Sequence, residues 1–264
     1  MMRPLFLPFL LSASIAHGAG YYLPNQDAFA TARGNAFVAT ADNPSAIHYN
    51  PAGLVQMDRP ELSLGMYSIQ LGKDVSIGGQ DYGARNRWQF VPHLYYAHPV
   101  SDDLVFGLGI NSPFGLGTKW GDNTPFRTVT TNGYLEFVSV TFATGYRIND
   151  HLSVGLGLSL NQADLTLDQG ISPRPATDVF RFEGDYLTPS ASVSVLYQPS
   201  EQHSFGAIFA LGTDDTLDGR ASVNGAGLGS ATLDFMTPNR AAIFMSQRER
   251  APSRRMVWVW FTIQ

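Results

Sequence analysis

The stretch Leu152-Ser153-Val154-Gly155-Leu156-Gly157-Leu158-Ser159-Leu160-Asn161 decides the fold, because large apolar residues alternate strictly with small or polar ones. Successive side chains of a β-strand point to opposite faces, so this stretch has one apolar face and one small, polar face. Alternation over about ten residues is typical of a strand that crosses an outer membrane. Further stretches alternate in the same way, at 104–110, 138–143, 190–197 and, less cleanly, 204–211.

The connections between these stretches alternate in length. Short turns fall at 99–103, 149–151 and 198–202, and long polar segments fall at 71–90, 111–132, 164–185 and 214–229. A soluble β-sandwich would also alternate along its strands. Regular alternation of short and long connections, however, is expected when one end of a barrel faces the periplasm and the other faces outside. We therefore predict an all-β fold, an antiparallel transmembrane β-barrel with about eight strands in residues 60–245. Aromatic girdles are expected at Tyr95, Tyr96, Tyr146, Tyr186 and Tyr197.

The first residues are an export signal. Arg3 is followed by the mostly apolar run 5–15 and by Ala16-His17-Gly18, where small residues stand at the two positions that a signal peptidase reads. A membrane anchor is the alternative, but the run is shorter than the ~20 residues that a spanning helix needs. We predict a signal peptide over residues 1–18.

The composition excludes several classes of protein. The formal net charge of −5 and the absence of cysteine disfavour a nucleic-acid partner, a disulfide framework and thiolate metal sites. No cluster of His, Asp and Glu has the spacing of metal ligands, so we expect no metal and no cofactor. A hydrolase would need a Ser–His arrangement, yet no motif surrounds the histidines of the predicted strand ends and turns. We predict that the protein is not an enzyme; these histidines are His93, His98, His151 and His203.

Residues 19–59 lack the alternation of a strand. The segment is rich in Ala, Asn, Asp and Gly, and Asn50-Pro51-Ala52-Gly53 has turn character, with Pro fixing φ and Gly permitting positive φ. Ahead of a barrel, such a segment is either a plug in the lumen or a periplasmic extension. We expect Asn50, Pro51, Ala52 and Gly53 to be structurally essential.

Several motifs together resemble the FadL/TodX family of outer-membrane transport proteins. They are the opening 19–26, the block 33–39, the hatch-like block Asp42 to Leu54, Asn111-Ser112-Pro113-Phe114-Gly115-Leu116, and 196–200. The resemblance extends from about residue 19 to about residue 244.

The resemblance implies a monomeric outer-membrane barrel of about fourteen strands that is closed by an N-terminal hatch. Long-chain fatty acids or other hydrophobic small molecules would cross it by passive diffusion, in contact with outer-membrane lipid. A kink in the third strand would open a lateral path, here at Gly107, Gly109 and Asn111-Ser112-Pro113, where Gly and Pro weaken strand pairing. Alternatively, the two glycines only make room for the hatch. A structural or adhesin-type barrel without transport is the alternative function.

Ligand contacts are expected in the second long connection. Phe114, Leu116, Trp120 and Phe126 would form an external apolar groove, and Lys119 or Arg127 would meet a carboxylate head group. In the alternative, these loop cations are simply solvated.

The length of the chain conflicts with a plugged barrel. A barrel of ~8 strands is filled by its own side chains and has no room for a hatch. From Ser246 the composition changes, with four arginines followed by Met256-Val257-Trp258-Val259-Trp260-Phe261. We hypothesise that a frameshift or early stop near Met245 removed the second half of the barrel, leaving an atypical tail at 246–264. In the alternative, residues 256–263 are a genuine ninth strand.

Overall fold

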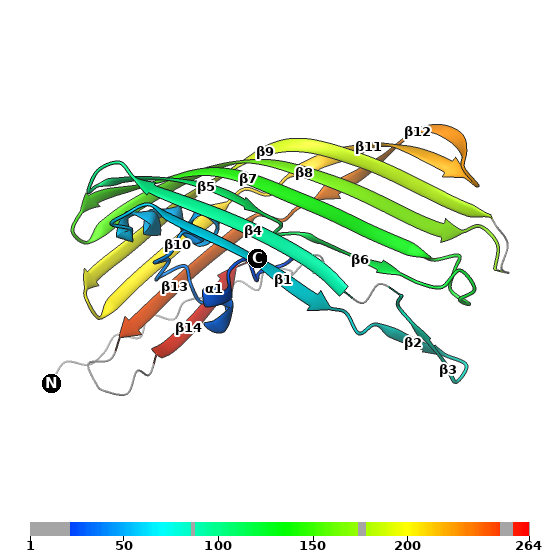
Figure 1. Ribbon diagram of the computed structural model, residues 1–264, viewed down its shortest axis with the longest axis horizontal. Helices are drawn as coiled ribbons and strands as arrows, with labels where there is room; N and C mark the ends of the chain where they lie inside the picture. The colour runs from blue at the N-terminus through cyan, green and yellow to red at the C-terminus, as the bar shows by residue number, and fades with distance from the viewer. Residues whose placement is uncertain (1–21, 86–87, 174–177, 249–255, 264) are drawn as a thin grey trace.

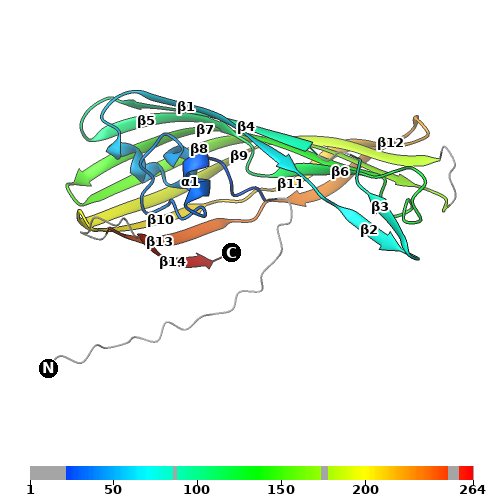
Figure 2. The same ribbon diagram turned by 60° about the horizontal axis from the view of Figure 1, so that its bottom comes forward.

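A computed structural model describes residues 22–85, 88–173, 178–248 and 256–263, so the predicted signal peptide lies outside the described residues. The described chain forms one curved antiparallel sheet with short helical segments against its concave side (Figures 1 and 2). The principal strands, in sheet order, are β1 (Glu61–Gln70), β4 (Trp88–Pro99), β5 (Leu104–Asn111), β7 (Asn132–Asn149), β8 (Leu152–Gly170), β9 (Val179–Ser200), β10 (His203–Ala210), β13 (Arg240–Arg248) and β14 (Met256–Ile263).

The remaining elements lie off this path. They are β2 (Asp74–Ile77), β3 (Gln80–Gly83), β6 (Gly115–Lys119), β11 (Asp214–Val223), β12 (Ala226–Met236), the helices α1 (Ala28–Ala32) and α2 (Ala46–Tyr49), and the 3-10 helix η1 (Pro51–Gln56). None of the helices in the described part of the chain is long and apolar enough to span a membrane.

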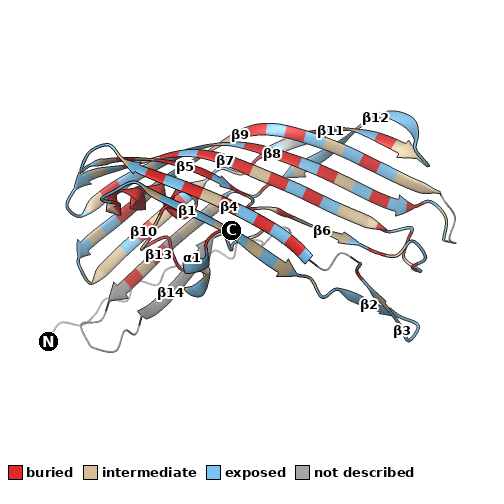
Figure 3. Cartoon of the chain, in the orientation of Figure 1, coloured by how far each residue is buried: buried red, intermediate tan, exposed pale blue. Residues whose placement is uncertain are grey.

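The predicted alternation places apolar side chains on the convex face. Along β8, Leu156, Leu158 and Leu160 keep 42%, 55% and 48% of their surface exposed. Red and blue bands alternate along the strands in Figure 3 for the same reason. An apolar convex face would be unfavourable in water but suits contact with lipid.

The concave face of β7 divides into three zones. Its inward residues are, from the short-turn end upward, Arg147, Gly145 and Ala143, then Thr141 and Ser139, then Phe137 and Leu135. We call these the hatch zone, the polar zone and the apolar zone. All of these residues face inward because every second residue of a strand lies on the same face.

The long connections contain more strand than the sequence analysis predicted. Strands β8 and β9 pair as far as Gly170 and Val179, so residues 164–170 and 179–185 belong to the ladder. The segment 214–229 lies mostly in the β11–β12 hairpin, and 71–90 contains the β2–β3 hairpin. The loop predictions were wrong there because the outward face becomes polar beyond the lipid: Asp164 is exposed, whereas its neighbours Ala163 and Leu165 are buried in an apolar cluster.

The aromatic girdle prediction holds for only part of its members. Tyr96, Tyr146 and Tyr197 point outward, with 38%, 50% and 46% of their surface exposed. The prediction was wrong for Tyr95 and Tyr186, which are buried on the concave side with 0% and 7% of their surface exposed. A strand end alone does not tell which face a residue occupies, because a shift by one residue reverses the face.

The two ends of the strand order are β1 and β14, and along the described residues each pairs on one side only. The sheet is therefore not closed. Residues 246–248 continue β13, and 256–263 pair with it as β14. This pairing agrees with the alternative interpretation of the tail as a strand; the frameshift hypothesis stays a prediction.

Candidate functional site

Residues 22–57, which we call the hatch, pack against the hatch zone of the wall. Asn50 is fully buried and holds the centre of the hatch together. Its side-chain nitrogen donates to Val38 O at 2.6 Å and to the wall at Val195 O at 3.2 Å. Its side-chain oxygen accepts from Ala52 N at 3.2 Å and caps η1. The predicted turn is thus a capped 3-10 helix, consistent with the structural role expected of Asn50.

Wall residues also bind the backbone of η1 directly. Ser153 of β8 donates to Ala52 O at 2.9 Å, and Ser194 of β9 accepts from Ala52 N at 3.0 Å. Arg147 of β7 donates to Val55 O at 2.5 Å. These contacts explain why the inward face of the strands carries serines and glycines, which allow the hatch backbone to approach closely.

The inward glycines leave room for the hatch. A Cβ atom at Gly155 would lie 2.2 Å from Ala52 N, and one at Gly107 would lie 2.6 Å from Ile47 Cγ1. A Cβ atom at Gly109 would lie 2.8 Å from Ile47 Cγ2. Strand β5 pairs with β7 without a register shift across both glycines. These observations favour the interpretation in which Gly107 and Gly109 accommodate the hatch, rather than form the kink.

The break in the wall lies directly after Asn111. Strand β5 ends there, and β6 begins at Gly115 with φ values of 133° at Gly115 and 91° at Leu116. A positive φ at leucine is sparsely populated, and such strain is found where the surrounding structure enforces it. The ladder between β4 and β5 ends at Leu94 and Ile110, so a seam follows in the wall.

The segment Tyr22–Gln26, which we call the strap, covers this seam from inside. Tyr22 forms an isolated bridge with Phe114, and Leu23 N donates to Pro113 O at 2.8 Å. The Gln26 side chain donates to Ser112 O at 2.9 Å. The predicted break at Asn111, Ser112 and Pro113 is therefore filled by the first described residues of the hatch.

A small cleft lies above the hatch. Its volume is about 80 Å³, and hatch, wall and strap all contribute to it. Arg240 of β13 reaches His48 of α2, with 2.6 Å between Nη1 and His48 Nε2 and 2.5 Å between Nη2 and His48 O. The other side is lined by Ser139 and Thr141 of the polar zone and by Ser159 of β8 and Ser192 of β9. The cleft thus combines a cation with several hydroxyl groups.

The apolar zone lies on the outer side of this cleft. It is a cluster on the inward face of β7, β8, β9 and β11, and Phe114 packs against it. Phe114 is 5.1 Å from Phe137 and 5.5 Å from Tyr22 between ring centroids. Its buried members are Leu135, Phe137, Ala163, Leu165, Phe182, Tyr186 and Leu217. An apolar inner wall differs from the polar lumen of a porin.

The predicted capture residues do not form one group. Trp120 and Phe126 pack together with centroids 5.2 Å apart, and Tyr82 of β3 joins them at 5.9 Å from Phe126. Phe114 instead lies in the lumen, beside the strap. Half-buried Leu116 and exposed Lys119 lie on β6. The structure therefore separates Phe114 from the outer aromatic cluster.

Arg127 is buried, and its guanidinium binds residues of the loops around Asp122 and Ser172, at the end of the sheet opposite the short turns. Its guanidinium is 1% exposed and donates to Asp122 O at 2.9 Å and to Ser172 O at 2.5 Å. It also pairs with Asp178 at 3.2 Å. These contacts support a structural role for Arg127 rather than the predicted contact with a head group.

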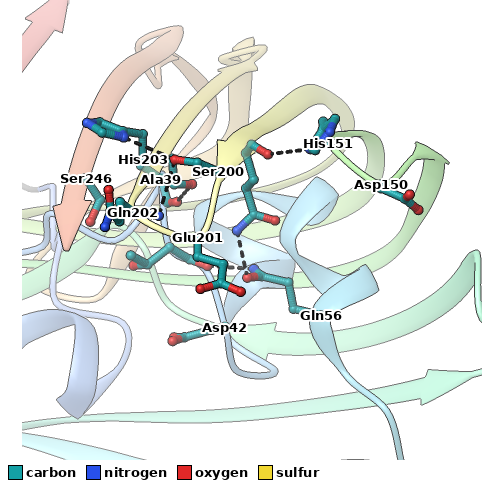
Figure 4. Close-up of a pocket in the computed structure, with 13 residues that line it drawn as sticks. Ala39, Asp42, Gln56, Asp150, His151, Ser200, Glu201, Gln202, His203 and Ser246 are labelled. Atoms are coloured by element: carbon teal, nitrogen blue, oxygen red, sulfur yellow. Dashed lines mark hydrogen bonds between the residues drawn. The ribbon is translucent and has the colours of Figure 1, made fainter. Parts of the chain in front are cut away.

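A larger pocket of about 590 Å³ lies at the short-turn end, below the hatch (Figure 4). Its lining is polar, and Gln56 of the hatch bonds to Gln198 of β9 at 3.3 Å within it. Ser200 and His203 are 3.1 Å apart between Oγ and Nδ1. The lining also includes Asp42, Asp150, His151 and Glu201. Such a lining binds water well and hydrocarbon poorly.

Two of the four histidines that the sequence analysis names, His151 and His203, line this polar pocket. His98, His151 and His203 lie at strand ends and turns as predicted, whereas His93 is buried inside, between Tyr67 and Tyr95. No group of three or more His, Cys, Asp or Glu residues that could hold a metal ion occurs in the described ranges.

Sequence reasoning missed His48 and Arg240, which line the cleft, and Gln26, which bonds to Ser112 O at the seam. His48 lies inside the hatch motif but has no neighbouring signal for its role. Arg240 begins a strand that is far from the hatch in sequence, so only the fold brings it there.

Comparisons with known proteins agree with this architecture. The long-chain fatty acid transport protein of Escherichia coli K12 is 26% identical over 179 residues, which are 65% of this chain and 37% of that protein. A FadL homologue of Pseudomonas aeruginosa superposes with a TM-score of 0.67 at 17% identity, covering 86% of this chain and 66% of the other. The toluene transporter TodX of P. putida gives 0.63 at 18%, covering 79% and 63%. This chain thus spans about a third of the length of the curated relatives that it matches.

The fold of these structures is the outer-membrane β-barrel, and the family comprises transporters of hydrophobic compounds. The sequence matches the family described as outer membrane protein transport protein (OMPP1/FadL/TodX) over residues 9–247. Together with the apolar convex face and the docked hatch, this match makes the chain a member of the FadL/TodX family of outer-membrane transport proteins.

Proposed function

We propose that this chain forms part of a transport path for long-chain fatty acids across the outer membrane, by passive diffusion. The observation that carries the proposal is the order of zones on the concave face. An apolar wall ends at a cleft that contains Arg240 and hydroxyl groups, directly above the hatch. A molecule with an apolar tail and an anionic head matches this order. An aromatic hydrocarbon would use the apolar zone alone.

The chemistry of both parts favours a long-chain acid. Each methylene group removed from water contributes about 0.8 kcal/mol, so a long acyl chain gains much from the apolar zone. A carboxylate next to a guanidinium forms shorter and stronger hydrogen bonds than a neutral head group does. Arg240 is half-buried, which reduces its screening by water.

We propose the seam after Asn111 as the exit. The strap that covers it is short, and Leu116 beside it holds a strained φ of 91°. The pocket below the hatch offers Asp42, Asp150 and Glu201 instead of apolar surface. A hydrophobic molecule would therefore leave sideways into lipid at lower cost than through that pocket.

The test is uptake of labelled oleate by a Gram-negative host that lacks its own fatty-acid transporter and expresses the full chain. Binding of oleate to the purified chain in detergent is measured in parallel. Arg240→Ala should weaken binding about tenfold or more, and the exposed control Arg220→Ala should not. A folded, inserted chain that neither binds nor imports oleate would overturn the proposed transport of long-chain fatty acids.

A further inference from the structure

A line of polar groups connects Arg240 with the seam in the wall. Arg240 Nη1 is 2.6 Å from His48 Nε2, and His48 Nδ1 is 3.2 Å from Asn111 Nδ2. Asn111 Nδ2 is 3.1 Å from Gln26 Oε1. Gln26 Nε2 then contacts two backbone carbonyls, Leu23 O at 2.8 Å and Ser112 O at 2.9 Å. The orientation of each group in this line follows from what its neighbours can donate or accept.

The contacts at the seam fix the orientation of the side-chain amides of Gln26 and Asn111. Carbonyl oxygens only accept, so Gln26 turns its NH2 group toward Leu23 O and Ser112 O. Its Oε1 then faces Asn111, which must offer its own NH2 group. The same nitrogen of Asn111 faces His48 Nδ1. For a hydrogen bond there, Nδ1 has to be the acceptor.

At the other end of the line, Arg240 requires the opposite tautomer of His48. A guanidinium has donors only, so Arg240 requires His48 Nε2 to be the acceptor. A neutral imidazole has one donor and one acceptor nitrogen, and therefore satisfies only one of these neighbours at a time. Protonation would turn both nitrogens into donors. Burial, and secondly the charge of Arg240, lower the pKa of His48 well below its ordinary value.

We infer that a carboxylate completes this line and that His48 is the residue that selects acids over neutral hydrophobic molecules. Binding would first break the 2.6 Å contact between Arg240 Nη1 and His48 Nε2, and a carboxylate oxygen would then accept from both nitrogens. His48 then carries its proton on Nε2, and Nδ1 accepts from Asn111. Each contact along the line then joins one donor to one acceptor. The cleft that both residues line, together with the hydroxyl groups of Ser139 and Ser192, provides the place.

This inference rests on the proposed function and adds the residue that gives its specificity. It also links head-group binding to the strap. With the acid bound, His48 Nδ1 accepts from Asn111 and so supports the orientation of Asn111 that Gln26 of the strap needs. A neutral ester or hydrocarbon leaves the line unsatisfied and the strap unchanged.

The experiment is ¹⁵N NMR of the full chain in detergent micelles with labelled histidine. The chain has six histidines, and His48→Phe identifies the resonances of His48. Without ligand, the proton should reside on Nδ1; with saturating oleate, it should move to Nε2. Methyl oleate should leave the tautomer unchanged. An unchanged tautomer with oleate, or the same change with methyl oleate, overturns the inference.

Calorimetry gives the second measurement and separates the two proposals. His48→Phe should weaken oleate binding about tenfold, as expected for the loss of a hydrogen bond to a charged group, and should leave methyl oleate binding unchanged. His151→Ala, an exposed imidazole, is the control. Failure of the wild-type chain to bind oleate contradicts the proposed function. Normal binding with an equal affinity of His48→Phe contradicts only the role of His48.

Discussion

Replacing Asn50 by alanine tests how firmly the hatch is docked. The substitution removes the cap of η1, which contributes about 1 kcal/mol in typical helices. It also leaves the buried Val38 O without its 2.6 Å donor, which costs about 1–3 kcal/mol. The sum is about 2–4 kcal/mol, or about 30- to 700-fold in the ratio of docked to undocked hatch. The expected result is faster amide exchange across the hatch by this factor.

Hydrogen exchange of the purified chain in detergent measures this ratio directly. Asn50→Asp retains the acceptor for Ala52 N but loses both donors, so it should retain the cap and lose the rest. Asn25→Ala removes an exposed amide of the same segment and should leave exchange unchanged. Exchange of hatch amides in Asn50→Ala within threefold of the wild type would refute the view that this side chain holds the hatch.

The remaining predictions concern the wall, the strap and the outer loops. Gly155→Ala places a Cβ atom 2.2 Å from a backbone nitrogen of η1, so it should destabilise the docked hatch by about 1–3 kcal/mol in the same exchange assay. Gly227→Ala, with open space around it, should have no effect. In a chain without native cysteine, the pair Tyr22→Cys and Phe114→Cys should block oleate uptake when oxidised and restore it on reduction; uptake by the oxidised pair contradicts lateral exit. Arg127→Ala should accelerate protease cleavage of the outer loops and affect oleate affinity less than Arg240→Ala does; the reverse order would restore the predicted head-group role.

The wall was predictable because each strand repeats a simple signal. In β8, the outward leucines and the inward glycines and serines alternate without interruption from Leu152 to Leu160, so sequence alone gives the faces and the end at the short turn. The pattern of outward apolar residues ends where the strand leaves the lipid. Beyond the lipid, Asp164, Thr166 and Asp168 remain in the β8 ladder although water replaces hydrocarbon outside. Polar residues there follow the solvent and not the secondary structure.

The site was harder to predict because its members come from distant segments and because similar residues perform different tasks. Arg127 and Arg240 are both arginines near predicted loops, yet one is enclosed by the carbonyls of neighbouring loops and the other reaches His48 in the lumen. No local pattern distinguishes them, since the difference depends on which strand brings each residue to the concave face.

His48 illustrates the remaining limit. Its position in the hatch motif indicates burial, but its function depends on two neighbours, Arg240 and Asn111, that compete for the single acceptor of a neutral imidazole. Such competition is absent from any list of residue types, because it arises only when donors converge on one ring from two sides. The same competition explains why a hatch rich in apolar contacts retains a polar line toward the seam. A hatch without this polar line would treat an acid and a hydrocarbon alike.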